Sequence, residues 1–267
     1  MTPKTSDAAA RTTALITGAS AGLGAEFARQ LASQGHDVVL VARNRARLEE
    51  SAAELERRYG VTAEVLPADL ASDDGVAAVV GRLSDPQRPV EILVNNAGIG
   101  LLHNFEDNPI LEEKKHLKLH GETAMELTHA ALKGMLERHS GRIINVASIA
   151  AFLPRGTYSA AKAWLVSFSR WANLSYGRQG IKVTAVCPGF THTEFHDRMG
   201  MDKSVAPSWA WLHAGRVVRD GLADNARGKA VSIPSRRYKV VAAVARIAPA
   251  RLVAGPARRP KGARTPQ

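Results

Sequence analysis

The chain has few of the features that mark secreted or membrane-spanning proteins. It has one cysteine, Cys187, in 267 residues, so no internal disulfide can form. No apolar run approaches the ~20 residues that span a bilayer. No apolar signal-peptide core precedes the first expected strand. The sequence therefore predicts a cytoplasmic protein without a transmembrane segment.

Acidic residues are missing from the last part of the chain. No Asp or Glu follows Asp224, whereas 11 of the 36 Lys and Arg residues lie beyond residue 226 and account for the net charge of +11. The rest of the chain is balanced, so no nucleic-acid partner is expected. Residues 251–267 form a basic, Pro-rich tail that is predicted to be solvated and disordered; contact with phosphate or anionic lipid is the alternative.

Short apolar segments alternate with helix-length amphipathic segments along most of the chain. Because the short segments are apolar at consecutive positions, they are typical of strands buried on both faces of a parallel sheet. The fold class is therefore α/β, with one doubly wound, mostly parallel seven-stranded sheet flanked by helices over residues 12–250, after a flexible arm at 1–11. The expected strands are 14–17, 38–42, 63–66, 92–94, 142–146, 183–186 and 230–233, and the expected helices are 26–34, 45–59, 74–83, 111–138 and 160–178.

The stretch Gly18-Ala-Ser20-Ala-Gly22 permits two interpretations. It matches the nucleophile elbow of serine hydrolases, with Ser20 as nucleophile. Together with Gly24 it also resembles a loop that holds a dinucleotide phosphate at a helix N-terminus. The stretch ends the first strand and carries three glycines, which favours the phosphate loop. The cofactor-binding positions expected here are Gly18, Ser20, Gly22, Leu23 and Gly24.

Further motifs follow in a fixed order. Asn95-Asn96-Ala97-Gly98 ends the fourth expected strand, and Tyr158-x-x-x-Lys162 opens a helix. With the glycine loop and a Pro-Gly-x-x-x-Thr motif, they resemble the short-chain dehydrogenase/reductase family over about Thr13 to Phe195. The resemblance implies a Rossmann-type fold and a nicotinamide cofactor. It implies further cofactor contacts at Asp69, Asn95, Ala97, Gly98, Tyr158, Lys162, Pro188, Gly189, Thr191 and Thr193.

The end of the second expected strand bears on the choice of cofactor. An acidic residue there would bind the ribose hydroxyls of NAD, whereas an arginine accommodates the 2′-phosphate of NADP. This chain has Arg43 and no carboxylate until Glu49. The sequence predicts NADP(H), unless Arg43 merely covers the sheet surface.

The Tyr158 helix predicts acid/base chemistry. Hydride transfer to a ketone leaves negative charge on oxygen, so a proton donor is needed. Lys162 lies one turn from Tyr158, where its ammonium is expected to lower the phenol pKa and, by the resemblance, to hold the nicotinamide ribose. Ser148 is the expected partner that orients the carbonyl. Only nine residues separate it from Tyr158, where the family usually has twelve.

His120 occupies the position of the family's helix asparagine, which anchors a water in the proton relay. Imidazole can also relay a proton, so His120 is a fourth candidate catalytic residue; alternatively it has no catalytic task. His116 and His120, like His192 and His196, stand four apart, but no carboxylates or thiols gather around them, so no metal is expected.

Apolar residues around the last motif suggest a pocket for an apolar carbonyl or alcohol substrate, although core or oligomer contacts would explain them equally. Trp164 and Trp171 fit either a homo-oligomer interface, dimer or tetramer, or core packing. The predicted function is NADP(H)-dependent hydride transfer to a hydrophobic ketone or from a secondary alcohol. An NADP-binding scaffold or sensor with little redox activity is the alternative. The apolar residues in question are Leu101, Leu102, Phe152, Leu153, Phe195, Met199, Met201, Trp209, Trp211 and Leu212.

Overall fold

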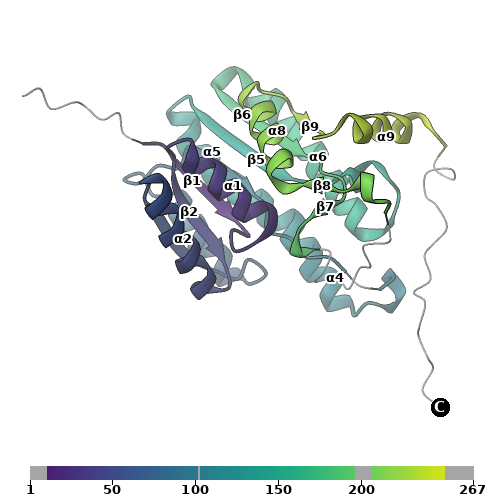
Figure 1. Ribbon diagram of the computed structural model, residues 1–267, viewed down its shortest axis with the longest axis horizontal. Helices are drawn as coiled ribbons and strands as arrows, with labels where there is room; N and C mark the ends of the chain where they lie inside the picture. The colour runs from purple at the N-terminus through teal and green to yellow at the C-terminus, as the bar shows by residue number, and fades with distance from the viewer. Residues whose placement is uncertain (1–10, 102, 196–205, 250–267) are drawn as a thin grey trace, which may run out of the picture.

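A seven-stranded sheet forms the centre of the protein (Figure 1). The structure is a computed structural model and describes residues 11–101, 103–195 and 206–249. The strand order is β3-β2-β1-β4-β5-β6-β9 and every pair is parallel, which confirms the doubly wound α/β prediction and corrects "mostly parallel" to parallel throughout this sheet. The strands are β1 Thr13–Thr17, β2 Asp37–Ala42, β3 Ala63–Pro67, β4 Ile92–Asn95, β5 Gly141–Val146, β6 Ile181–Val186 and β9 Val231–Ser232.

The strand order reverses between β1 and β4, which are neighbours in the sheet. The residues of β4 are buried throughout, and those of β1 after Thr13 are buried as well, as the continuous apolar runs predicted. At such a reversal the loops after the two strands diverge and leave a crevice at their carboxyl ends. The functional site is therefore expected beside Thr17 and Asn95.

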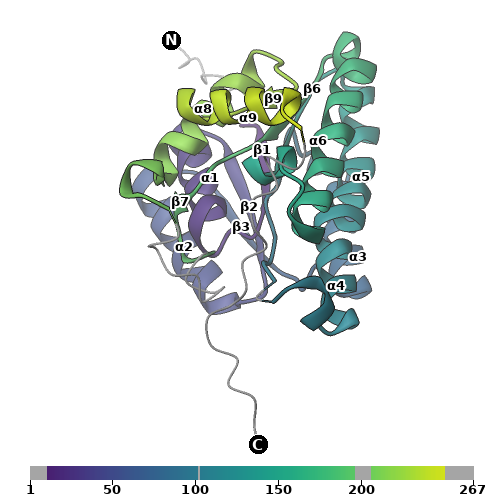
Figure 2. The same cartoon turned by 90° about the vertical axis from the view of Figure 1, so that its right-hand side faces the viewer.

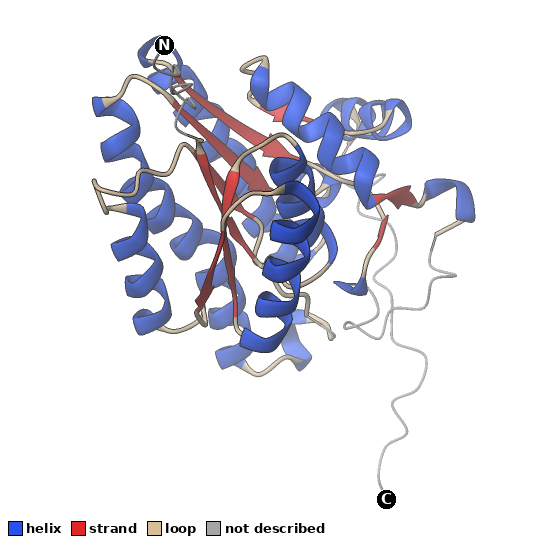
Figure 3. Ribbon diagram, turned by 60° about the vertical axis from the view of Figure 1, so that its left-hand side comes forward, coloured by secondary structure: helices blue, strands red, loops and turns tan. Residues whose placement is uncertain are grey.

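Helices cover both faces of the sheet (Figures 2 and 3). Asn44 and Ser72 begin two of them by accepting a hydrogen bond from the backbone three residues on. No helix within the described residues combines the length and apolarity that a membrane crossing requires. The helices are α1 Gly22–Ser33, α2 Arg45–Tyr59, α3 Asp73–Leu83, α4 Ile110–Leu117, α5 Thr123–Glu137, α6 Gly156–Tyr176, α8 Ala214–Ala226 and α9 Arg236–Ile247.

The predicted helix at 111–138 is helical over nearly its whole length but is not α-helical throughout. A π-helical turn, Lys118–Glu122, separates α4 from α5 and contains His120. Such turns admit one extra residue and are frequent at functional sites. Periodicity did not reveal this turn, nor did it predict α8, α9 and the short second sheet of β7 Thr191–His192 and β8 Leu212–His213.

The core lies in two layers, one on each face of the sheet. Phe27 and Leu31 of α1 pack with Val217 and Leu222 of α8 on one face. The other face is covered by α3 and α5, with Met135 fully buried. The sheet is thus enclosed on both sides, and its carboxyl edge remains the place where polar side chains gather.

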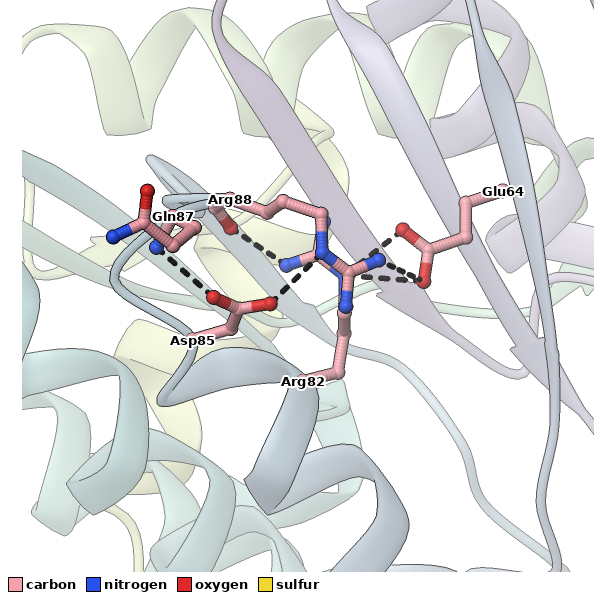
Figure 4. A network of polar contacts seen from close by, with 5 residues as sticks. All are labelled: Glu64, Arg82, Asp85, Gln87 and Arg88. Atoms are coloured by element: carbon pink, nitrogen blue, oxygen red, sulfur yellow. Dashed lines mark hydrogen bonds and ion pairs between the residues drawn. The ribbon is translucent and has the colours of Figure 1, made fainter.

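A charged network supports the edge strand β3 (Figure 4). Arg82 of α3 is nearly buried; its Nε donates to both carboxylate oxygens of Glu64, at 3.1 and 2.8 Å, and its Nη1 donates to the carbonyl oxygen of Arg88 at 2.7 Å. Arg88 is exposed and also binds Asp85. Because Arg82 is shielded from water and its partners are well aligned, this arginine should matter more to stability than Arg88.

We therefore expect Arg82→Ala to lower the free energy of unfolding by about 2 kcal/mol, since the part-buried carboxylate of Glu64 and the carbonyl of Arg88 lose their donor. Arg88→Ala should cost less than about 1 kcal/mol, as exposed pairs do. Urea unfolding of both variants measures the difference. Equal losses would contradict this account of the edge.

Candidate active site

The loop between β1 and α1 is shaped to hold an anion. Gly18 and Gly22 have φ of 67° and 57°, a region that favours glycine. A Cβ on Gly24 would lie 2.1 Å from the carbonyl oxygen of Gly18, so α1 begins directly against the loop. The first turn of α1 has neither an acidic residue nor a side-chain cap, which leaves its amides for a phosphate. Ser20 is half-buried in the loop, and Leu23 packs against the core.

Thr17 fastens this loop to the Asn-Asn-Ala-Gly motif. Its buried Oγ1 accepts hydrogen bonds from the backbone nitrogens of Asn96 and Ala97, both at 2.9 Å. The amide of Asn96 in turn donates to the carbonyl oxygen of Thr17 at 2.8 Å. The predicted contacts Ala97 and Gly98 are thereby held beside Gly18. Sequence reasoning missed Thr17, although its position just before Gly18 was a usable signal.

Asn95 belongs to a second buried network. Its Nδ2 donates to Oδ1 of Asn145 at 2.9 Å and to Oγ1 of Thr128 at 3.1 Å. Asn145 then donates to Ser169 of α6 at 2.9 Å. Because these residues come from β4, β5, α5 and α6, the network holds four elements together behind the crevice. Oδ1 of Asn95 is buried without a partner in the described structure.

The ends of β2 and β3 present charged groups on the expected adenine side. Asp69 is exposed after β3, and Arg43 is exposed directly after β2, with no ion pair among the described residues. Arg47 instead pairs with Glu194 at 3.3 Å, and Asn44 caps α2. Arg43 is thus the guanidinium left available at this strand end.

Helix α6 carries Tyr158 and Lys162 to the carboxyl edge of the sheet. Lys162 is only 4% exposed, and its Nζ donates to the carbonyl oxygen of Val146, at the end of β5, over 2.7 Å. The same Nζ lies 5.7 Å from the centre of the Tyr158 ring. The two residues therefore meet as the spacing of four predicted.

The charge states of this pair differ from the expectation. Burial raises the pKa of Tyr158 to about 12 and lowers the pKa of Lys162 to about 7, because each charged form loses its hydration. The polar side chain of Ser148 acts on Tyr158 in the opposite sense and lowers its pKa in part. The net pKa shift of Tyr158 is therefore upward, opposite to the expected lowering by the Lys162 ammonium, because desolvation is its largest cause.

Ser148 reaches Tyr158 despite the shortened loop. Its Oγ accepts a hydrogen bond from the backbone nitrogen of Ala150 at 3.1 Å and so begins a short 3-10 helix, Ile149–Phe152. The backbone nitrogen of Ile149 donates to the carbonyl oxygen of Pro188 at 2.9 Å. This compact helical turn lets the shorter loop connect β5 to α6 while Ser148 stays at the end of β5.

His120 lies beside Tyr158, with 5.7 Å between ring centres. It is buried against Gly98, and its Nε2 lies 2.8 Å from the carbonyl oxygen of Ile99. A carbonyl only accepts, so Nε2 carries the proton and Nδ1 is an unpartnered acceptor within the described structure. Burial keeps the pKa of His120 well below 6.5, with Lys162 acting in the same direction. The imidazole is neutral at physiological pH.

A small cavity opens among these groups. It is lined by Asn95, His120 and Lys162, among others, and has room for about one water molecule. The unpartnered atoms of Asn95 and His120 are both acceptors, whereas the Lys162 nitrogen can donate. The cavity thus offers the mixed polar lining that an ordered water or a cofactor hydroxyl requires.

His116 and Glu113 extend the polar cluster behind Tyr158. The His116 ring lies 4.5 Å from that of His120 and 5.8 Å from that of Tyr158. Burial lowers the pKa of His116, and neither its Nε2 nor Oε2 of Glu113 has a partner among the described residues. Sequence reasoning considered His116 only as a metal ligand. No group of three or more metal-binding side chains occurs in the described part of the chain.

The segment that follows Pro188-Gly189 lies against the phosphate loop. A Cβ on Gly22 would lie 3.3 Å from the Cβ of Thr193, so the two loops touch. Buried Thr191 donates through Oγ1 to the carbonyl oxygen of Gly189 at 3.0 Å. Gly189 itself lies against the ring of Tyr238 from α9, a contact the sequence did not indicate. These contacts place the expected nicotinamide residues beside the glycine loop.

The apolar residues expected to line a substrate pocket differ in burial and in their neighbours. Phe195 lies next to Tyr158, with 6.4 Å between ring centres. Trp211 is buried against Phe190, which favours the core alternative for it, whereas Trp209 is 62% exposed. Leu102, Met199, Met201 and His196 lie outside the described residues, as do the arm at 1–10 and the tail at 251–267.

Comparison with known proteins identifies the family. The model of the short chain dehydrogenase family matches residues 12–204, more than half of the chain. The chain belongs to the short-chain dehydrogenase family. It is therefore an oxidoreductase acting on carbonyl and alcohol groups, of a family that uses nicotinamide cofactors. The sequence resemblance is confirmed.

Individual short-chain dehydrogenases are similar over most of the chain. A ketoacyl reductase of Nostoc sp. is 32% identical, covering 83% of this chain and 77% of its own. A short-chain dehydrogenase from Sphingobium yanoikuyae, solved in complex with NADPH, superposes with a TM-score of 0.81 at 34% identity, covering 87% and 93% of the two chains. A bulky-bulky ketone specific alcohol dehydrogenase from Comamonas testosteroni gives 0.76 at 30% identity, covering 86% and 90%.

The lowered pKa of Lys162 makes stability depend on pH. Between about pH 7.5 and 8.5 the unfolded lysine, with its usual pKa of 10.5, holds a proton that the folded one, at about 7, has released. In this range the unfolded state binds more protons than the folded state. Raising the pH therefore disfavours the unfolded state, and the free energy of unfolding increases by up to about 1.4 kcal/mol per pH unit.

Lys162→Met removes this contribution. Denaturant titrations over that range should therefore show a steeper rise in the wild type than in the variant, and exposed Lys133→Met should keep the wild-type slope. Parallel slopes for wild type and Lys162→Met would mean that the buried lysine stays charged.

Proposed function

We propose that this short-chain dehydrogenase catalyses NADP(H)-dependent reduction of a hydrophobic ketone, or the reverse oxidation of a secondary alcohol. The observation that carries the proposal is the meeting of Tyr158, Ser148 and Lys162 at the carboxyl edge of the sheet, next to the glycine loop. The relatives support it, because one is described with NADPH and another as specific for bulky ketones.

The residues fit the cofactor. Gly18 and Gly22 adopt the left-handed backbone conformations that shape the loop, and the amides that begin α1 suit a pyrophosphate. The unpartnered acceptors of Asn95 and His120 suit hydroxyl groups. When bound, the reduced nicotinamide supplies hydride to the carbonyl carbon. Every remaining task falls to side chains of this chain.

Tyr158 delivers the proton to the carbonyl oxygen. Its raised pKa keeps the phenol protonated at neutral pH, so the donor is loaded before reaction. An alkoxide is a far stronger base than a phenolate, so proton transfer from Tyr158 is downhill once charge develops on the oxygen. Ser148 donates a second hydrogen bond to the same oxygen and orients it. In the reverse direction, oxidation of an alcohol, Tyr158 accepts the proton as a phenolate.

Lys162 and His120 return a proton to Tyr158 after it has protonated the substrate. Lys162, with a pKa of about 7, can both give and accept a proton near neutral pH. Neutral His120 offers Nδ1 as an acceptor beside the water-sized cavity, while its Nε2 donates a hydrogen bond to the carbonyl oxygen of Ile99. His120 thereby replaces the amide expected in the family by a group that binds water without carrying charge.

Arg43 selects NADP(H) over NAD(H). Its exposed guanidinium follows β2 directly and would bind the 2′-phosphate through charge-assisted hydrogen bonds. The next carboxylate after it along the chain, Glu49, is already paired with Arg45 at 3.6 Å. No competing anion thus adjoins Arg43 in sequence.

The substrate is an apolar carbonyl compound or alcohol, and the protein acts as a homo-oligomer. Phe195 beside Tyr158 supports the first point. For the second, Trp164 and Trp171 are 39% and 52% exposed, with Trp164 stacked on Phe168 and Trp171 packed at an angle to it. This exposure argues against core packing and leaves an aromatic face on α6 for a second copy.

Replacing Tyr158 by Phe should lower kcat for a panel of apolar ketones about 10²- to 10⁴-fold, since only the proton donor is lost. NADPH binding, followed by cofactor fluorescence, should be nearly unchanged. Tyr176→Phe, on the same helix but away from the site, is the matched control. Unchanged turnover in Tyr158→Phe refutes the mechanism, whereas tight NADPH binding by wild type with no turnover of any carbonyl favours a scaffold or sensor.

Arg43→Gln should weaken NADPH binding about 10- to 100-fold, the worth of charge-assisted hydrogen bonds to a phosphate, and leave NADH binding unchanged. Titration of both cofactors measures the ratio. Arg57→Gln, an exposed arginine later on α2, should change neither. A variant that loses affinity for both cofactors equally would show that Arg43 supports the fold instead.

A further inference from the structure

Helix α9 exposes an apolar stripe to solvent. Val240, Val244 and Ile247 lie at spacings of four and three, on one face, and are 63%, 50% and 85% exposed. In this helix only Ala242 is buried. Figure 1 shows α9 at the margin of the molecule, far from α1 and α2. A helix of a globular protein normally turns such a stripe inward, so this exposed stripe is available to an occupant outside the described fold.

Cations flank the stripe without matching acids. Arg236, Arg237, Lys239 and Arg246 belong to α9, and no Asp or Glu follows Asp224 anywhere in the chain. An exposed helix that combines an apolar stripe with cations is typical of segments that lie in the headgroup region of an anionic bilayer. The helix thus has the chemistry of a membrane-surface anchor.

A cavity beside the first turn of α9 is also basic. It lies between α8 and α9, and its cations outnumber its two acids. Both acids are engaged: Asp224 binds Lys229 at 2.8 Å and Arg227 at 3.3 Å, and Asp220 binds Arg216 at 3.6 Å. The other charged groups of the lining, Arg236 and Lys239, have no ion pair among the described residues and are left for an anion.

α9 is held firmly enough to act as a docking element. The Tyr238 hydroxyl accepts from the backbone nitrogen of Phe190 at 3.2 Å and donates to the carbonyl oxygen of Ala210 at 2.8 Å. Arg237 donates to the carbonyl oxygen of Trp209 at 2.7 Å and lies over its exposed ring. Trp209 adds an aromatic side chain of the kind found at membrane interfaces, next to the start of the stripe.

We propose that α9 docks on the surface of a bilayer that contains anionic phospholipid. Val240, Val244 and Ile247 enter the boundary between headgroups and acyl chains, and Arg236 and Lys239 bind lipid phosphate at the cavity between α8 and α9. Charge favours this occupant over a second copy of the chain, because two α9 helices would bring cations against cations. The surface does not depend on the proposed hydride transfer.

Docking has a consequence for the active site. Tyr238 lies against Gly189 and bonds Phe190, so α9 is joined to the segment that lies against the glycine loop. If the reduction of an apolar ketone proposed above holds, a docked α9 brings this segment close to the lipid in which such a substrate dissolves.

The test is cosedimentation of the full-length protein with vesicles, without cofactor or substrate, so that the outcome is independent of turnover. Vesicles of phosphatidylcholine alone are compared with vesicles that also contain phosphatidylglycerol. The wild type should bind the anionic vesicles at least tenfold more tightly. Val244→Ser/Ile247→Ser, which keeps the net charge, and Arg236→Gln/Lys239→Gln should each weaken that binding about tenfold or more.

Arg57→Gln/Arg178→Gln is the matched control, because it removes the same charge from exposed positions elsewhere and should bind like the wild type. Far-UV circular dichroism checks that each variant folds. The proposal is overturned if the wild type does not bind anionic vesicles, or if the serine variant binds as tightly as the wild type, since the basic tail alone would then suffice.

Two further outcomes would also overturn it. Binding of inorganic phosphate by a wild type that does not bind anionic vesicles would identify a free anion as the ligand. The second outcome combines two results: the wild type does not bind vesicles, and sedimentation velocity shows that the serine variant has lost an oligomer that the wild type forms. That combination would identify a second copy of the chain as the occupant.

Discussion

The hydrogen bond from Lys162 to the carbonyl oxygen of Val146 is the contact on which the site depends. It joins α6 to the end of β5 at 2.7 Å, inside a region where the lysine is almost inaccessible to water. Tyr158, one turn earlier, and Ser148, two residues beyond Val146, take their positions from this junction. Burial also sets the protonation of Tyr158 and Lys162. It raises the pKa of the phenol, which stays protonated at neutral pH, and lowers the pKa of the lysine to about 7.

Polar groups at the carboxyl edge form two kinds of network. One joins Thr17 and Asn96, each of which bonds the backbone of the other, and it holds the glycine loop against the Asn-Asn-Ala-Gly motif. The other runs from Asn95 through Asn145 to Ser169 and is incomplete: within the described structure, buried atoms of Asn95 and of the neighbouring His116 and His120 have no partner. Unsatisfied buried groups cost stability, so their concentration beside Tyr158 is best explained by ligands and water that complete them during function.

Local chemistry explains why much of the site was predictable from the sequence. The glycine loop, the Asn-Asn-Ala-Gly motif and Tyr158 with Lys162 each work through a few neighbouring residues, and parallel strands bring them to one edge. The π turn at His120, the contact of Tyr238 with Gly189 and the Arg82 network depend on residues distant in sequence. The sign of the Tyr158 pKa shift was mispredicted because spacing shows that a lysine is near but not how far both groups are desolvated.

The central claim is that protein groups at this edge deliver a proton while hydride passes to a carbonyl carbon. The most direct measurement supplies NADPH deuterated at the transferred position, with a prochiral apolar ketone, and locates the label in the product. The account predicts deuterium on the carbinol carbon with the wild type and almost none in the same time with Tyr158→Phe. Equal labelling by both proteins, or bound NADPH that is never oxidised by any carbonyl compound, would contradict it.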